Sequence, residues 1–193
     1  ILDEVYCGTG TSGKIFCCEY DKVKPDFVFI GKTLAAGYGP ISAVITSKKL
    51  ADKFKKYQGR IQHTTTYQGH SLSAAAALAV QKIIHRDSFL ESVNEKGNEM
   101  RNIINSELEN HPFYFDVRGR GLRFSFEYNC KNRNQFSDQL QNIMFEKHSI
   151  LMSIKFHRIC FTPALIISKK QYYEVLEKLI KEFKLLASKW TEI

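Results

Sequence analysis

The sequence predicts a two-part α/β protein, and three observations lead to that prediction. Short apolar runs bounded by glycine in the first third are typical of strands covered on both faces. An alanine-rich segment follows them, and alanine favours a helix more than any other residue. The remaining half alternates amphipathic stripes with shorter strand-like runs, a pattern typical of a small two-layer α/β domain.

Residues 1–88 hold the first set of predicted elements. Phe27–Ile30 is an apolar run that ends at a glycine, and residues 40–46 form a second run after Gly37 and Gly39. Both suit buried strands of a mostly parallel sheet. Residues 73–80 contain five alanines and predict a helix whose small side chains permit close packing.

Residues 89–193 are expected to form a second, smaller domain. Ser88–Glu91 and Ser168–Gln171 match the capping box that begins a helix, and apolar residues recur at helical spacing after each. Gly97 falls inside the first of these helices, where glycine lowers helix propensity. The segments between the two helices predict a strand, a polar helix and two further strands, at 122–127, 135–147, 149–154 and 159–167.

Composition places the chain among folded soluble proteins. Of its 193 residues, 44% are hydrophobic and 25% are charged, which excludes a largely disordered or collagen-like chain. Five cysteines, an odd number without a C-x-x-C pair, argue against a disulfide framework or a zinc site and favour a reducing compartment. No apolar run approaches the roughly 18–20 residues of a membrane helix. We therefore expect a cytoplasmic protein without metal or membrane contact, with a mitochondrial location left open.

The first residues have the pattern of the middle of a strand. Ile1 and Leu2 lead directly into two acidic residues, with neither an initiating Met nor the basic-then-apolar pattern of a signal peptide. We expect the chain to be the C-terminal portion of a longer polypeptide, so that functional expectations apply to that longer protein first.

The net charge of +8, from 28 Lys and Arg against 20 Asp and Glu, favours nucleic-acid or anionic-surface binding in general. The densest basic cluster consists of Lys48, Lys49, Lys53, Lys55 and Lys56. It lacks the interleaved aromatic and Arg side chains of a base-reading surface. We interpret it as the solvated side of a surface helix whose Leu50, Ala51 and Phe54 point inward, and predict no nucleic-acid partner.

Residues Gly8–Lys14 match the beginning of a phosphate-binding P-loop, G-x-x-x-x-G-K. The match fails at Ile15, where a P-loop carries a hydroxyl for the metal. The segment up to Pro25 also lacks the helical stripe that would aim amide N–H groups at a phosphate. We interpret these residues as a flexible turn and reject a nucleotide-triphosphate site.

Asp3 and Lys32 form a more informative pair. Each lies at the C-terminal end of an apolar run, and ligands of open α/β sheets bind beyond those strand ends. Apolar surroundings would lower the pKa of Lys32 and favour the neutral amine, the form that attacks a carbonyl. The neighbouring glycines would leave room for a flat ligand close to the backbone. The spacing alone is equally compatible with an ordinary surface or salt-bridged lysine.

Hydroxyl residues at 64–66 precede the alanine-rich helix. They could donate to a phosphate or cap the helix, and the cap is the favoured interpretation. His63 and His70 have no acidic or cysteine neighbours at ligand spacing, so we interpret them as loop histidines.

Six motifs occur in a fixed order, and together they resemble the C-terminal half of a class-III pyridoxal-phosphate-dependent aminotransferase, an enzyme of fold type I. They are Leu2–Val5, Gly8–Lys14, Pro25–Lys32, Thr66–His70, Asp116–Leu122 and Thr162–Ile167. The resemblance covers nearly the whole chain. It implies that residues 1–88 are the C-terminal part of the large cofactor-binding domain and that residues 89–193 are the small C-terminal domain.

The resemblance also implies roles for individual residues. Lys32 would bind pyridoxal phosphate covalently and move the proton between substrate and cofactor. Asp3 would keep the pyridine nitrogen protonated, and Val5 would pack against the ring. Thr66 would bind the cofactor phosphate across a subunit interface, which implies a homodimer.

Two positions depart from the family pattern, and the N-terminal half of the pattern, with its own site residues, lies outside the sequence. Tyr6 stands where members commonly have a Gln that contacts the cofactor phenolate, so this contact would fall to a longer side chain. Cys160 stands where an Arg usually binds the substrate carboxylate. Arg158 would share a strand face with position 160 and either replaces that Arg or is an ordinary surface residue.

The implied activity is transfer of an amino group from an amine or amino acid to a 2-oxo acid, with donor and acceptor left open. One alternative is another pyridoxal-phosphate enzyme of the same fold, such as a racemase, aminomutase or decarboxylase, because Lys32 and Asp3 would serve all of them. The other is a non-catalytic basic binding module that kept the fold, with Tyr6 and Cys160 as signs of lost activity. We expect the 193 residues alone to be inactive, and the sequence leaves open whether they fold alone.

Overall fold

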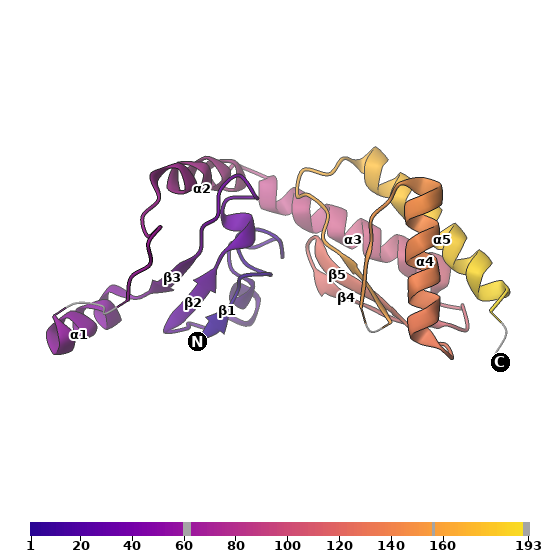
Figure 1. Cartoon of the computed structure of the whole chain (residues 1–193), viewed down its shortest axis with the longest axis horizontal. Coiled ribbons are helices and arrows are strands. Elements are labelled where there is room, and N and C mark those ends of the chain that lie inside the picture. The colour runs from indigo at the N-terminus through magenta and orange to yellow at the C-terminus, as the bar shows by residue number, and fades with distance from the viewer. Residues whose placement is uncertain (60–62, 156, 191–193) are drawn as a thin grey trace. The chain divides into compact units, whose positions relative to one another are not determined.

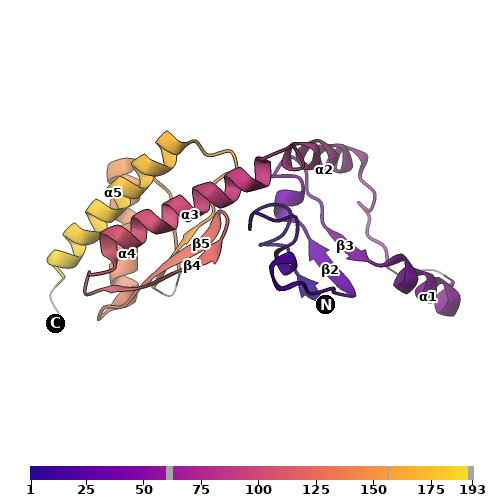
Figure 2. The same ribbon diagram turned by 180° about the vertical axis from the view of Figure 1, so that it is seen from behind.

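The computed structural model describes residues 1–59, 63–155 and 157–190. Contacts within the chain divide it into two compact units, Ile1–Ser92 and Val93–Ile193. Figure 1 and Figure 2 show the elements of both units from opposite sides. The assignment of residues 1–88 and 89–193 to two domains of a complete protein stays a prediction.

The first unit contains a three-stranded sheet in the order β1 (Leu2–Asp3), β2 (Phe27–Ile30) and β3 (Ala43–Thr46). β1 runs parallel to β2, whereas β3 pairs with the other edge of β2 in the antiparallel sense. Val28 and Ile30 are buried, so the strand predicted at these residues is confirmed. An antiparallel edge strand is common on otherwise parallel sheets. Since β1 and β2 are parallel, their carboxyl ends lie at the same edge of the sheet.

Two 3-10 helices and an α-helix follow the strands of this sheet. Two short 3-10 helices follow β1 and β2: η1 (Cys17–Asp21) and η2 (Lys32–Leu34). The helix α1 (Lys48–Gln58) exposes all five lysines of the basic cluster and sets Phe54 against Phe27, with ring centroids 6.2 Å apart. The predicted surface helix with solvated lysines is confirmed, but Phe54, which was predicted to point inward, is 38% exposed. That the cluster has no nucleic-acid partner stays a prediction.

The helix α2 (Ser71–Ile84) confirms the helix predicted from the alanine-rich segment and extends it at both ends. The prediction that hydroxyls at residues 64–66 cap it is wrong. His70 is the N-cap, and its Nδ1 accepts a hydrogen bond from the Ser73 amide at 3.3 Å. An unprotonated imidazole nitrogen can accept from an orphan amide as a hydroxyl does, so His70 is a capping residue rather than a simple loop residue.

The second unit is a two-layer α/β arrangement. Its antiparallel sheet has the strand order β4-β5-β7-β6, formed by β4 (Tyr114–Arg120), β5 (Arg123–Tyr128), β7 (Arg158–Phe161) and β6 (Ser153–Lys155). The three helices are α3 (Phe89–Leu108), α4 (Arg133–His148) and α5 (Lys169–Ser188). Contacts to alternate residues of β5 place all three helices against one face of the sheet.

The sequence predicted four of these seven elements closely and differs for the rest. β4 was not predicted, because a register irregularity between Tyr114 and Asp116 breaks its alternation. The runs at 149–154 and 159–167 form only short strands, and the second ends before Pro163, which cannot donate to a ladder. Ser168 forms the predicted capping box with Gln171. Ser88 instead has a φ of 61°, outside the extended region of an ordinary N-cap.

Four aromatic rings form the centre of the second unit. Phe126 and Tyr128 of β5, Phe136 of α4 and Phe183 of α5 are each exposed by at most 1%. Phe183 lies 5.1 Å from Phe126 and 5.5 Å from Phe136, measured between ring centroids. Aromatic pairs at these separations stabilise beyond the area they bury, so this cluster joins the sheet to two of its helices.

None of the helices in the described part of the chain has the length and apolar character that a membrane-spanning helix requires.

Gly97 lets α3 approach the turn between β4 and β5. A Cβ atom at position 97 would overlap the carbonyl oxygen of Gly121, and this same oxygen accepts a hydrogen bond from Nη1 of Arg101 at 3.0 Å. The glycine that lowers helix propensity in the sequence is therefore required by the contact between helix and turn.

Replacing Gly97 with Ala should destabilise the second unit. The higher helix propensity of alanine stabilises the helix by roughly 1 kcal/mol. Overpacking costs roughly 1–3 kcal/mol, and we expect the upper end of that range because the added Cβ would meet backbone atoms of Gly121 and not a flexible side chain. The expected net loss is about 2 kcal/mol, measured by denaturant unfolding of the complete protein. Glu95→Ala, an exposed change in the same helix, is the matched control. A Gly97→Ala variant as stable as wild type would contradict this account.

Glu99 of α3 collects three donors from the beginning of α5. Its carboxylate accepts from Nζ of Lys169 at 2.7 Å, from the Tyr172 hydroxyl and from the Tyr173 hydroxyl. The bond from Lys169, followed by those from Tyr172 and Tyr173, lowers the pKa of Glu99 to about 2.

The stabilisation from Glu99 should therefore depend on pH. A carboxyl whose pKa is lowered by folding contributes fully above its unfolded value and loses the contribution as pH falls towards its folded value. Thermal unfolding midpoints of wild type and Glu99→Gln should differ at pH 6 and converge between about pH 4.5 and pH 2. Glu91→Gln, on the same helix, should show no such convergence. A constant difference between wild type and Glu99→Gln down to pH 2 would refute the assignment.

Candidate functional site

The parallel pairing of β1 with β2 brings Asp3 and Lys32 to the same edge of the first sheet. Asp3 ends β1 and is the register partner of Phe29, while Lys32 follows the end of β2 after a single glycine. Both side chains are exposed. The placement expected from the spacing of the two residues is confirmed, and it is the edge at which α/β sheets bind ligands.

Lys32 has an unusual backbone conformation for its position. Its φ is 45°, in the left-handed region that residues with a Cβ adopt rarely. The turn around it is closed by a hydrogen bond of 2.8 Å from the Leu34 amide to the Gly31 carbonyl. Nζ lies 4.6 Å from the centre of the Tyr6 ring, within the range of a cation–π contact. Backbone strain of this kind concentrates at functional sites.

Asp3, Val5 and Tyr6 are arranged by the tight turn after β1. Oδ1 of Asp3 accepts from the Val5 amide at 3.0 Å, which fixes the orientation of the carboxylate at the strand end. Val5 packs against Gly31, where a Cβ would lie 3.6 Å from Cγ1 of Val5. Of the predicted cofactor residues, these three and Lys32 are therefore brought together.

An open hollow of about 580 Å³ lies beside Lys32. It is lined by Lys32, Thr33, Ala36, Gly37, Gly39, Pro40 and Ile41. The helix α2 supports it, because Nε2 of Gln81 donates to the Leu34 carbonyl at 3.1 Å. A Cβ at Gly39 would come within 2.9 Å of the Ser73 Cα, so glycine is needed for the helix to approach. The glycines that line the hollow let a flat ligand approach the backbone.

The segment Gly8–Gly13 is not the flexible turn that the sequence predicts. Thr9 and Ser12 are exposed by only 3% and 1%, and the Thr9 amide donates to the Ile15 carbonyl at 2.7 Å. The hydroxyls of both residues are buried without a partner among the described residues. The segment is buried because it closes around the carboxylate of Glu4, which accepts hydrogen bonds from the amides of Cys17 and Cys18.

Glu4 is the site residue that the sequence analysis missed. It is exposed by 3%, and its amide donates to the Phe29 carbonyl at 2.9 Å, which extends the β1–β2 ladder. The signal was present in the two adjacent acids, because successive strand residues point to opposite faces. If Asp3 faces the ligand edge, its neighbour must point inward and needs buried partners.

Thr66 lies in the turn of residues 66–69, where it is exposed, and no hydrogen bond or ion pair among the described residues joins it to the sheet edge. The described structure therefore adds no contact between Thr66 and the sheet edge. Its predicted contact to the cofactor of a second subunit stays a prediction.

Arg158 belongs to the second unit and points to the side of the sheet opposite the helices. Its Nε lies 3.8 Å from Oε1 of Glu127, whose Oε2 accepts from Arg118 at 2.9 Å. Cys160 lies on the same strand face as Arg158, as the alternation of exposed and buried residues in β7 predicts. The carboxylate of Glu127 thus lies between two guanidinium groups.

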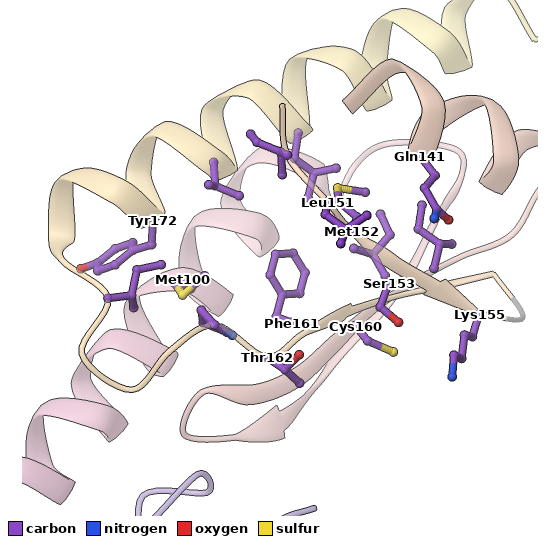
Figure 3. A pocket seen from close by; sticks show the side chains of 17 residues that line it. Met100, Gln141, Leu151, Met152, Ser153, Lys155, Cys160, Phe161, Thr162 and Tyr172 are labelled. Carbon is purple, nitrogen blue, oxygen red and sulfur yellow. The ribbon is translucent and has the colours of Figure 1, made fainter. Parts of the chain in front are cut away.

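A second hollow of about 580 Å³ lies between α5 and the strands β6 and β7 (Figure 3). Its lining is mainly apolar and includes Met100, Met152 and Phe161, together with Cys160 and Thr162. The Thr162-Pro163 motif thus borders a cavity within the second unit.

Among the described residues, no group of three or more His, Cys, Asp or Glu side chains could hold a metal ion.

Comparison with known proteins gives a consistent result. Residues 1–183 match the family model described as aminotransferase class-III. An ornithine aminotransferase of Halalkalibacterium halodurans is 33% identical over 182 residues, which cover 93% of this chain and 42% of that protein. The gamma aminobutyrate transaminase 3 (chloroplastic) of Solanum lycopersicum is 31% identical over 194 residues, covering 95% of this chain and 37% of that protein.

A solved structure of the ornithine aminotransferase of Toxoplasma gondii superimposes with a TM-score of 0.83 at 25% identity. The match covers 97% of this chain and 44% of that one, and the structure is described as having partial occupancy of PLP at its active site. The chain spans about two fifths of the length of the relatives it matches.

Proposed function

The chain belongs to the class-III aminotransferase family, and from this premise we propose that the complete protein transfers an amino group from an amine or amino acid to a 2-oxo acid. The observation that carries the proposal is the meeting of Lys32 and Asp3 at one sheet edge, beside a glycine-lined hollow. A primary amine and a carboxylate so placed are the groups that this chemistry needs from the protein.

Class-III aminotransferases depend on pyridoxal phosphate, and the residues at the sheet edge fit this cofactor. Lys32 offers an exposed amine, Asp3 an oriented carboxylate and Val5 an apolar surface, while the glycines admit a flat ring. When bound, the cofactor acts as an electron sink for the substrate Cα. We propose that Lys32 holds the cofactor through its amine and that Asp3 keeps the ring nitrogen protonated.

The remaining roles concern orientation and proton movement. Lys32, which follows β2 at the sheet edge, would move the proton at the substrate Cα. Tyr6, whose ring lies beside the Lys32 amine, would face the cofactor phenolate at the position where the resemblance implies a Gln. Thr66 would bind the cofactor phosphate of a second subunit, which makes the proposed active unit a homodimer. We propose a cytoplasmic location for this enzyme, with a mitochondrial location left open.

Arg158 is the candidate for binding the substrate carboxylate. Its side chain is about half exposed, at 47%, and its contact to Glu127 is long enough to leave the guanidinium accessible to a ligand. The related proteins are named for ornithine and gamma-aminobutyrate, and both compounds carry a carboxylate. We propose an amino donor of this general kind, with a carboxylate for Arg158.

Replacing Lys32 with Ala in the complete protein should abolish transamination, because the amine that holds the cofactor and moves the Cα proton is lost. Lys24→Ala, an exposed change just before β2, is the matched control and should retain full activity. Borohydride reduction of the wild-type protein with bound cofactor, followed by peptide mass mapping, should find the cofactor on Lys32. Label on another lysine would contradict the assignment.

Replacing Asp3 with Asn should retain some bound cofactor but lose most of the turnover. A neutral amide cannot hold the proton of the ring nitrogen, so the ring withdraws electrons less strongly. Turnover should be measured at saturating cofactor, so that weakened binding is not mistaken for slow chemistry. The control is Asp26→Asn, outside the sheet edge, and near wild-type turnover of Asp3→Asn would refute the role.

A further inference from the structure

The carboxylate of Glu4 is buried in the first unit and accepts two hydrogen bonds from backbone amides. Oε2 accepts from the Cys17 amide at 2.6 Å, and Oε1 accepts from the Cys18 amide at 2.8 Å. Both distances are in the short range of charge-assisted hydrogen bonds. A buried carboxylate is tolerated when hydrogen bonds satisfy both of its oxygens, as they do here.

These bonds close the whole segment between Glu4 and η1. The Gly8 amide donates to the Glu4 carbonyl at 2.9 Å, and a Cβ at Gly8 would lie only 2.9 Å from that oxygen. The glycine at this position therefore lets the chain turn around Glu4. Glu4 thus binds both ends of the segment. Its backbone carbonyl accepts from Gly8 near the start, and its carboxylate accepts from Cys17 and Cys18 at the end.

The side chains of the proposed site extend from this closed segment. Asp3 and Val5 flank Glu4 directly, and Tyr6 follows with its ring 4.6 Å from Nζ of Lys32. We propose that Glu4 is a positioning residue for the site: by closing the segment of residues 5–18 from inside, it holds Asp3, Val5 and Tyr6 against Lys32. This inference rests on the proposed function, because it assigns Glu4 a role in turnover as well as in folding.

Glu4→Gln is the informative substitution because it preserves shape. A glutamine has one acceptor oxygen, and its NH₂ group would face an amide N–H that also donates. One of the two anchoring bonds is lost, and a donor meets a donor. Asp21→Asn is the matched control, since Asp21 is an exposed acid at the end of η1.

The first measurement tests the anchor and needs no cofactor. Burial, followed by hydrogen bonding and charge from Glu4, raises the pKa of the Cys18 thiol to about 11. Removing the carboxylate should lower this pKa. Alkylation of Cys18 by iodoacetamide at pH 8 should then accelerate about three- to fourfold for each unit of pKa lost, because the thiolate fraction rises tenfold while the nucleophilicity of the thiolate falls. Hydrogen exchange of residues 5–18 should quicken in Glu4→Gln. Both readouts should stay close to wild type in Asp21→Asn, and a far-UV circular dichroism spectrum of Glu4→Gln unchanged at the assay temperature excludes general unfolding.

The second measurement tests positioning in the holoenzyme. At saturating cofactor and substrates, Glu4→Gln should lower kcat about ten- to a hundredfold, the scale expected when catalytic groups shift by about an ångström. The absorbance band of the bound cofactor should change shape or position. Glu4→Asp, which keeps the charge, should recover part of both signals.

The outcomes separate the two proposals. If wild type binds cofactor and turns over while Glu4→Gln has the same kcat and spectrum, Glu4 is only structural and this inference is overturned. If the wild-type protein neither binds the cofactor nor transfers an amino group, the proposed function fails and the positioning role fails with it. Loosened exchange, faster Cys18 alkylation, reduced kcat and an altered spectrum together would support it.

Discussion

The parallel pairing of β1 with β2 is the constraint on which the first unit depends. Only because both strands point the same way do Asp3 and Lys32, 29 positions apart in the sequence, come to the same sheet edge. The pairing is short, and the hydrogen bond from the Glu4 amide to the Phe29 carbonyl extends it by one residue. A two-residue strand has little stability of its own, since strand pairs gain it from wider sheets and packing. The buried contacts of Glu4 are what hold this strand end in place.

The site combines exposed reactive groups with buried supports. Lys32, Asp3 and Tyr6 are all exposed, whereas Glu4, Gly8 and Gly31 beneath them are buried. Such a division follows from chemistry, because groups that meet a ligand must be accessible and their geometry must still be fixed by a packed layer. The left-handed conformation of Lys32 fits this picture, since a strained residue persists only where its surroundings determine it.

Much of this arrangement could be predicted from the sequence, and the failures have identifiable physical causes. Glycine-bounded apolar runs located β2, and the alanine run located α2, because both signals are local. The common edge of Asp3 and Lys32 followed from strand-end logic. Glu4 was missed because its partners lie 13 and 14 residues away and are backbone amides, which leave no mark in side-chain identity. From the sequence, Gly97 only lowers helix propensity. The reason for glycine at this position is the carbonyl of Gly121, a backbone group that leaves no mark in the sequence either.

The two departures from the family pattern can now be judged by what the side chains do. The Tyr6 ring lies over the Lys32 amine, so the substitution occupies the site and does not leave it open. Cys160 lies on the strand face opposite the helices, and a positive charge lies two residues away on that same face, on Arg158 beside Glu127. A decaying binding module would not be expected to keep an oriented carboxylate and a strained lysine at one sheet edge. Neither departure therefore removes the placement of Asp3 and Lys32 at one sheet edge, on which the proposed function rests.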